Sequence, residues 1–186
     1  MRIVAGRWRG RRLEAPAGAG TRPTADRVRQ ALFDMLWHAP WGGRERVEGA
    51  LVLDAFAGTG ALGLEALSRG ASRVAFVDEG AAARALLREN IEKARAMGVT
   101  DIWRRDATRL GPNRGAGYDL IFMDPPYGMA LGEAALQSAL DGGWLADSAV
   151  VVWEDSSPPA LPHAFDLLDQ RRYGDTIVTI LQRRPG

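Results

Sequence analysis

The sequence predicts an α/β protein built on one doubly wound, mostly parallel sheet. From residue 50 onward, short apolar runs alternate with segments of helical periodicity, which is the pattern of repeated strand–helix units. The first of these runs leads into a glycine-rich turn, and several of them end in an aspartate. A length of 186 residues suits one such domain with a substantial core.

Seven strands are expected, and the last two form a closing hairpin around Gly174-Asp175. The expected strands are Ala50–Asp54, Arg73–Asp78, Asp101–Arg105, Tyr118–Asp124, Ala149–Glu154, Phe165–Tyr173 and Thr176–Gln182. The expected helices between them are Ala61–Ser68, Ala81–Met97 and Leu131–Leu140.

A small hairpin and a helix are expected ahead of the sheet. The segment Ile3 to Leu13 alternates loosely and contains two glycines, which favours a hairpin. After a Gly/Pro/Ala loop, Thr24 can cap a helix. The apolar stripe of that helix is Val28, Ala31, Leu32, Met35 and Leu36. We therefore divide the chain into a basic hairpin and helix, residues 1–40, and a main domain, residues 41–186.

Composition excludes several classes of protein. The chain has no cysteine, so disulfides and thiolate metal sites are excluded, and two isolated histidines do not make a zinc centre. We expect no bound metal. No stretch is long and apolar enough to span a bilayer, and the N-terminus lacks the apolar core of a signal peptide. A cytoplasmic protein is expected.

Positive charge is concentrated at the start of the chain. The formal net charge is only +1, but residues 1–30 contain eight arginines against Glu14 and Asp26. A basic N-terminal segment, residues 1–30, followed by a mildly acidic remainder of the chain suggests contact with a nucleic acid.

The tetrapeptide Asp124-Pro125-Pro126-Tyr127 follows the fourth apolar run and suits the methylation of a planar amino group. The lone pair of such a nitrogen is delocalised, so an acceptor placed at each of its two hydrogens can hold it and draw density toward a methyl donor. Asp124 and the Pro125 carbonyl form such a pair, the prolines fix φ, and Tyr127 offers a face for stacking. Taken alone, the tetrapeptide also fits an ordinary proline turn.

The turn after the first strand contains a G-x-G-x-x-G pattern at Gly58, Gly60 and Gly63. This pattern is compatible with a dinucleotide site, with Asp78 as the ribose ligand. However, the glycines begin four residues after Asp54, and that carboxylate would repel a pyrophosphate. S-adenosylmethionine instead presents a sulfonium and an ammonium group, which acidic strand ends attract. We therefore expect an S-adenosylmethionine site.

Within this site, Asp78 is expected to accept from the ribose hydroxyls and Asp106 from the adenine amino group, with Ala107 in backbone contact. All lie at the carboxyl ends of strands, where open α/β sheets bind ligands. The expected cofactor-binding residues are Asp54, Ala55, Phe56, Gly58, Thr59, Gly60, Asp78, Glu79, Asp106 and Ala107, with Thr24 as a further member if it is more than a helix cap.

With these segments assembled, the chain resembles the 16S rRNA guanine-966 N2-methyltransferase family, the small-subunit methyltransferases D. The resemblance rests on Arg2–Arg11, Arg22–Arg29, Asp54–Gly60 and Asp124–Tyr127. It implies a Rossmann-like class I methyltransferase fold and methyl transfer from S-adenosylmethionine to N2 of a guanine in 16S rRNA. It also implies a monomer acting on the small ribosomal subunit or its assembly intermediate.

The basic N-terminal segment, residues 1–30, is then the expected RNA-binding surface. Its arginines would meet phosphates, and Trp8 would stack on a base unless it packs within the hairpin. The expected RNA-binding residues are Arg7, Trp8, Arg9, Arg11, Arg12, Arg22, Arg27 and Arg29.

Three other interpretations remain open. The first is an amino-methyltransferase with another target, DNA adenine N6 or protein glutamine N5. Glutamine chemistry usually has Asn in place of Asp124, and no segment is long enough for a DNA-recognition insert. The second is a nicotinamide-dependent oxidoreductase, which leaves Asp54 and the proline pair unexplained. The third is a non-catalytic RNA-binding assembly factor. The intact tetrapeptide Asp124–Tyr127 argues against it.

Overall fold

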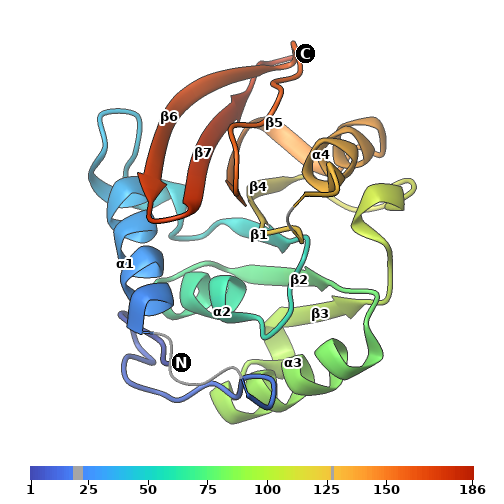
Figure 1. Cartoon of the computed structure of the whole chain (residues 1–186). Helices are drawn as coiled ribbons and strands as arrows, with labels where there is room; N and C mark the ends of the chain where they lie inside the picture. The colour runs from blue at the N-terminus through green and yellow to red at the C-terminus, as the bar shows by residue number, and fades with distance from the viewer. Residues whose placement is uncertain (19–22, 127) are drawn as a thin grey trace.

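A seven-stranded sheet runs through the middle of the molecule, with helices on both of its faces (Figure 1). The computed structural model describes residues 1–18, 23–126 and 128–186, without the side chains of Pro23 and Thr24. The strand order is β3-β2-β1-β4-β5-β7-β6. The strands are β1 (Leu51–Asp54), β2 (Arg73–Val77), β3 (Thr100–Trp103), β4 (Tyr118–Met123), β5 (Leu145–Asp155), β6 (Phe165–Tyr173) and β7 (Thr176–Arg183).

Strand β1 lies at the switch point of the sheet. It pairs in parallel with β2 on one side and with β4 on the other, so the chain winds outward from it in both directions. Only β7 is antiparallel to its neighbours, β5 and β6. The carboxyl ends of β1 and β4 therefore meet at one edge, where a doubly wound sheet opens a crevice for ligands.

The strands bury both faces, as their nearly continuous apolar sequences require. Alternate residues such as Val52 and Phe122 pack with α1 (Pro23–His38), α2 (Ala61–Ser68) and α3 (Ala81–Ala94) on one face. Their neighbours Leu53 and Ile121 pack with α4 (Leu131–Asp141) on the other. Three short 3₁₀ turns complete the described elements: η1 (Arg44–Arg46), η2 (Met97–Val99) and η3 (Ala107–Arg109).

The N-terminal segment folds back on itself, but it forms only one formal antiparallel bridge, Arg2 to Arg12. Backbone hydrogen bonds run from Ile3 N to Arg11 O at 2.9 Å, from Gly10 N to Ile3 O at 2.8 Å and from Leu13 N to Met1 O at 3.0 Å. The backbone amides of Val4 and Ala5 instead donate to the Glu65 carboxylate on α2, at 2.8 and 3.1 Å. These two donors are used by a helix side chain, so the antiparallel pairing does not continue past Ile3.

The segment is nevertheless part of the main core. Ile3 and Leu13 are buried together with α1 and α2 against the sheet. Buried Asn90 of α3 donates to the backbone carbonyls of both Glu14 and Thr59, and thereby links this segment to the glycine turn. The division at residue 40 stays a prediction.

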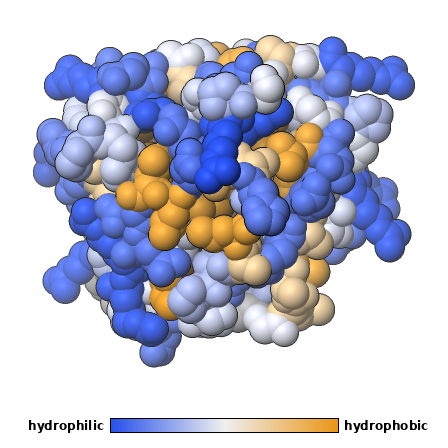
Figure 2. Space-filling view, turned by 90° about the horizontal axis from the view of Figure 1, so that it is seen from above, coloured by the Kyte–Doolittle hydropathy of each residue, from blue (hydrophilic) through white to orange (hydrophobic). Residues whose placement is uncertain are grey.

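Most element boundaries agree with the sequence pattern to within two residues. One exception is α3, which ends at Ala94 because Arg95 adopts a left-handed backbone with φ 56°. Another is β5, which begins at Leu145, four residues early, and passes through Ser148 at φ 62°. Figure 2, a view from above Figure 1, shows that apolar side chains gather in the middle of that face and hydrophilic ones surround them.

Candidate active site

A cavity of about 640 Å³ lies at the carboxyl ends of β1, β2 and β4, beside η3. It collects ten residues that the sequence predicts for the site: Ala55, Phe56, Gly58, Asp78, Glu79, Asp106, Ala107, Asp124, Pro125 and Pro126. Val77, Arg105, Thr108, Met129 and Leu131 complete its lining. Four separate segments therefore converge on one hollow, as the alternating pattern predicts.

The glycines of the turn after β1 have different roles. Gly58 and Gly60 have φ of 53° and 80°, a region that other residues adopt only with strain. Gly63 lies inside α2, where an added Cβ would meet the Phe76 ring at 2.4 Å. The first two glycines shape the turn, and the third lets α2 lie against β2.

Asp78 at the end of β2 holds this turn in place. Its Oδ2 accepts from the Gly58 amide and its Oδ1 from the Gly80 amide, both at 2.9 Å. Each carboxylate oxygen has a second lone pair, so Asp78 can also accept from hydroxyl groups of a ligand. It thus orders the turn and lines the cavity at once.

Asp106 sits at the N-terminus of η3. Its Oδ1 accepts from the Thr108 amide at 2.9 Å and from the Thr108 hydroxyl at 2.7 Å. These hydrogen bonds lower the pKa of Asp106 below its ordinary value. The site therefore presents an ionised acceptor at this end of the cavity.

Asp54 ends β1 and is only 2% exposed. The Gly63 amide donates to its Oδ2 at 3.1 Å. Burial, with the nearby carboxylates of Asp124 and Asp78, raises the pKa of Asp54 to about 8. A cationic ligand in the crevice would favour the ionised form of this group.

A second cavity of about 890 Å³ adjoins the first and shares Phe56, Gly58 and Asp124 with it. Asp54, Thr59 and Glu154 face into it as well. Its rim combines parts distant in sequence: Met1, Ala15, Pro16, Ala25 and Val28 from the N-terminal region, and 173–176 from the β6–β7 turn. Asp124 therefore lies where two adjoining spaces meet.

The loop after β4 brings three of the four residues expected to act on the acceptor amine, Asp124, Pro125 and Pro126, to the lining of the first cavity. Asp124 and Pro126 are exposed, whereas Pro125 is buried. Tyr127, and with it the expected stacking face, lies outside the described residues.

The sequence reasoning missed Glu154. This residue lies at the end of β5, and the signal that identified Asp54 and Asp78, an acid at a strand's carboxyl end, applies to it equally. Burial and the carboxylates of Asp124 and Asp54 raise the pKa of Glu154 to about 8, against the opposing effect of Arg29. Three acids, Asp54, Asp124 and Glu154, thus line the larger cavity.

The expected RNA-binding residues do not form one uniform surface. Arg7, Arg9, Arg11, Arg12 and Arg27 are exposed. Trp8 is half-buried, with the guanidinium groups of two arginines over its ring: Arg7 at 4.5 Å and Arg11 at 5.7 Å. The Arg11 guanidinium also donates to the Ala94 carbonyl at 3.1 Å.

Arg29 corrects the prediction for this surface. It is 4% exposed, and its guanidinium bonds Glu65 at 3.2 Å, Asp26 at 2.8 Å and the Arg2 carbonyl. A side chain used in this way is not available to a phosphate. Arg22 lies outside the described residues, and so does the side chain of Thr24, whose role stays a prediction.

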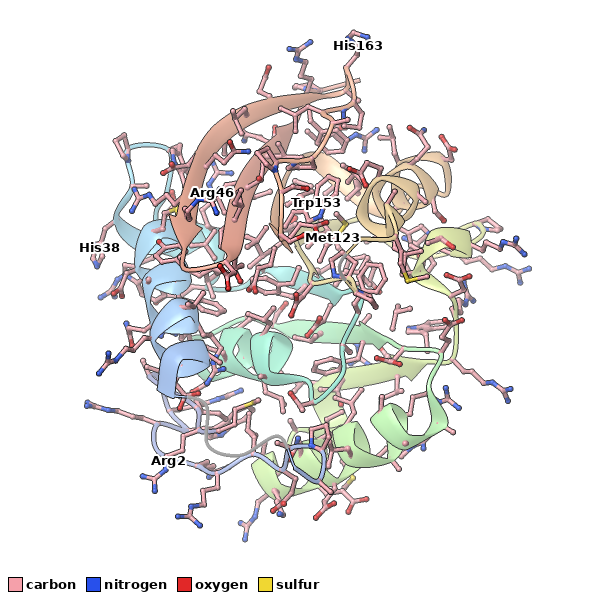
Figure 3. All side chains as sticks on the ribbon, in the orientation of Figure 1. Arg2, His38, Arg46, Met123, Trp153 and His163 are labelled. Atoms are coloured by element: carbon pink, nitrogen blue, oxygen red, sulfur yellow. The ribbon has the colours of Figure 1, made fainter. Side chains whose placement is uncertain are left out.

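Two other kinds of site are absent from the described part of the chain. No three His, Cys, Asp or Glu side chains there are grouped to hold a metal ion. Figure 3 shows His38 and His163 at separate places on the surface. None of the described helices combines the length and apolar character needed to cross a membrane.

Comparison with known proteins identifies the family. Residues 1–182 match the family described as Conserved hypothetical protein 95. Ribosomal RNA small subunit methyltransferase D of Escherichia coli K12 is 36% identical over 186 residues, covering 98% of this chain and 90% of that protein. The chain belongs to the small-subunit ribosomal RNA methyltransferase D family.

Two further relatives agree with membership in the methyltransferase D family. A putative rRNA methyltransferase of Bacillus subtilis, YlbH, is 35% identical, covering 99% of this chain and all of that protein. The solved structure of the putative methyltransferase yhhF from Escherichia coli superposes with a TM-score of 0.85 at 35% identity, covering 100% of this chain and 99% of that one. The predicted family and the class I methyltransferase fold are confirmed.

Proposed function

We propose that this protein transfers a methyl group from S-adenosylmethionine to the exocyclic N2 of a guanine in small-subunit 16S rRNA. The products are N2-methylguanine and S-adenosylhomocysteine. The observation that carries the proposal is the position of Asp124, which lines both the cavity bounded by Asp78 and Asp106 and the larger cavity beside it. One space suits the methyl donor and the other the acceptor base.

The acids of the first cavity fit a cationic adenosyl cofactor. When bound, S-adenosylmethionine supplies a methyl group activated by its sulfonium charge. Asp78 and Asp106 offer carboxylate oxygens to hydroxyl and amino groups, while buried Asp54 faces the adjoining cavity with a carboxyl group whose ionised form a cationic donor would favour. A pyrophosphate would meet repulsion at the same place, which disfavours a nicotinamide cofactor.

Asp124 and the Pro125 carbonyl would hold the two hydrogens of the acceptor amine. This arrangement turns the nitrogen lone pair toward the first cavity, and alignment of this kind supplies much of the barrier reduction in group transfer. The amine becomes acidic only as its bond to the methyl carbon forms, so its proton leaves afterward, to Asp124 or to water. A base stacked in a helix must first swing out, at a cost of a few kcal/mol.

The exposed arginines of the N-terminal segment support an RNA substrate. They lie on the same segment whose Met1, Ala15 and Pro16 rim the acceptor cavity. RNA phosphates bound there would lie close to the entrance for the base. We propose that the substrate is the small subunit or its assembly intermediate, that the enzyme acts as a monomer, and that the reaction is cytoplasmic.

The decisive test is labelled methyl transfer to small subunits, and to free 16S rRNA, that lack the modification, followed by nucleoside analysis. The label is expected on N2 of guanine. Label on adenine, or none on RNA, would reject the proposal and favour one of the alternatives.

A substitution of Asp124 separates binding of the acceptor amine from binding of the cofactor. Asp124→Ala should abolish transfer while S-adenosylmethionine still binds, because the cofactor retains Asp54, Asp78 and Asp106. The matched control is Asp147→Ala, an aspartate on β5 whose side chain is 75% exposed, and it should keep full activity. Retained transfer in the Asp124 variant would show that the acceptor role is misassigned.

A further inference from the structure

Glu154 is the neighbour of Asp124 across the sheet. Strands β4 and β5 pair in parallel, with Phe122 opposite Val152 and Met123 opposite Trp153. Figure 3 shows Met123 and Trp153 close together in the middle of the molecule. Asp124 is the first residue after β4 and Glu154 is the next residue on β5, and adjacent strands lie about 4.8 Å apart. The two acids therefore lie near each other, one where β4 ends and the other near the end of β5.

Both acids face the larger cavity, where the acceptor base is proposed to bind. Glu154 approaches it from β5, on the side of Asp124 away from β1. Among the described residues, none donates a hydrogen bond to the Glu154 carboxyl group, so its oxygens can accept from a ligand. A hydrogen bond from a donor such as N1–H favours the ionised form of this carboxyl group, in which both oxygens are acceptors.

The backbone of Glu154 is held on a paired strand. Its strand pairs with β4 as far as Trp153 and with β7 on the other side, where Val178 lies opposite Glu154 in the register. Trp153, directly before it, is fully buried. A carboxyl group carried on a strand held in this way can determine which ligand edge fits.

The two amino-bearing purines differ at the atom beside the amine. Guanine presents two N2 hydrogens and the N1 hydrogen, which are three donors in a row. Adenine presents two N6 hydrogens and then the N1 lone pair, which is an acceptor. The Pro125 carbonyl, Asp124 and Glu154 offer three acceptors, so they match guanine and oppose adenine.

We propose that Glu154 is a specificity-determining residue that accepts the N1 hydrogen of the target guanine beside Asp124. This proposal rests on the proposed function, because it assigns a further contact to the same acceptor base. Against the ionised Glu154 carboxylate, a base with a lone pair at N1 would place two acceptors against each other in the cavity. Sites built around such a hydrogen bond discriminate strongly against ligands that lack the donor.

The test compares two bases in one RNA substrate. Guanine at the target position is replaced by 2-aminopurine, which keeps the amino group at position 2 but carries a lone pair at N1. The measured quantity is the ratio of kcat/KM for the guanine substrate to that for the 2-aminopurine substrate. For the unaltered enzyme we expect a ratio of roughly 10 to 100 in favour of guanine.

Glu154→Gln should lower this ratio at least about tenfold, because an amide can donate to the N1 lone pair as well as accept from N1–H. Both substrates are measured on one enzyme preparation, so a loss of folded protein cancels in the ratio. The missing O6 of 2-aminopurine affects both enzymes alike. The matched control is the next residue, Asp155→Asn, whose carboxylate accepts from the Ser156 amide, and it should keep the original ratio.

The outcomes are distinct. A Glu154→Gln ratio equal to that of the unaltered enzyme would overturn the role of Glu154 while leaving the proposed function intact. That role is overturned equally if Asp155→Asn changes the ratio as much as Glu154→Gln does. Failure of the unaltered enzyme to methylate guanine N2 at all would instead remove the proposed function, and the role of Glu154 with it.

Discussion

Arg29 and Glu65 form a buried ion pair, with Arg29 Nε 3.2 Å from Glu65 Oε1. The same carboxylate accepts from the amides of Val4 and Ala5 and from Arg69 Nε, so it joins the N-terminal segment, α1 and α2. These elements also carry the exposed arginines and part of the rim of the larger cavity. One buried acid therefore positions the proposed RNA-binding surface relative to the crevice.

Glu65→Gln should destabilise the protein, because it keeps the shape of the side chain but removes the counter-charge of buried Arg69 and leaves buried Arg29 with Asp26 alone. Breaking a buried ion pair costs about 3–5 kcal/mol, and we expect a fall of that order in the free energy of unfolding measured with urea. The control is Glu48→Gln, an exposed acid 3.9 Å from Arg44, with an expected change below about 0.5 kcal/mol. Equal losses in both variants would contradict the assigned role.

Gly63→Ala tests whether the third glycine serves packing. The added methyl group would meet the Phe76 ring at 2.4 Å, and the helix would have to shift from β2. Overpacking of this kind costs about 1–3 kcal/mol of unfolding free energy. Gly98→Ala is the control, since its Cβ would meet nothing within 4 Å and its backbone φ is not positive. A neutral Gly63→Ala would show that α2 tolerates the shift.

The sequence pattern predicts which acids gather at the two cavities because their placement follows from local rules. Asp54, Asp78 and Asp106 each end a strand or start a turn, and the sheet brings such ends together. Glu154 obeys the same rule, but its importance depends on lying next to Asp124, which only the register of β4 and β5 reveals.

The N-terminal region departs from the sequence pattern where partners are distant in sequence. Val4 and Ala5 donate to Glu65, sixty or more residues away, and this limits the antiparallel pairing of the segment to a single formal bridge. Arg29 looks like its exposed neighbours in the sequence, yet the same glutamate buries it. Local alternation and charge cannot show such a contact, because it depends on how α1 and α2 pack.

The arginine surface predicts a salt-dependent affinity for RNA. Changing Arg7, Arg9 and Arg12 together to Gln should weaken binding and make the slope of log K against log salt shallower by about 0.7 to 0.9 per lost phosphate contact. Filter binding or fluorescence anisotropy at several salt concentrations measures this slope. Arg184→Gln, an exposed arginine near the C-terminus, is the control. An unchanged slope in the triple variant would remove the N-terminal segment from the RNA interface.

The raised pKa of Asp54 predicts that the affinity for the methyl donor depends on pH. Burial and the carboxylates of Asp124 and Asp78 raise this pKa to about 8, so below that pH the empty crevice holds a proton which a cationic ligand must displace. Affinity for S-adenosylmethionine should therefore increase with pH and level off above about 8, with proton release on binding detectable by calorimetry in buffers of different ionisation enthalpy. S-adenosylhomocysteine lacks the sulfonium charge and should show a shallower dependence.

Asp54→Asn should bind the donor more weakly and flatten the pH profile. A profile that keeps its slope in this variant would assign the proton to another group, with Glu154 the next candidate, since its pKa is also raised to about 8.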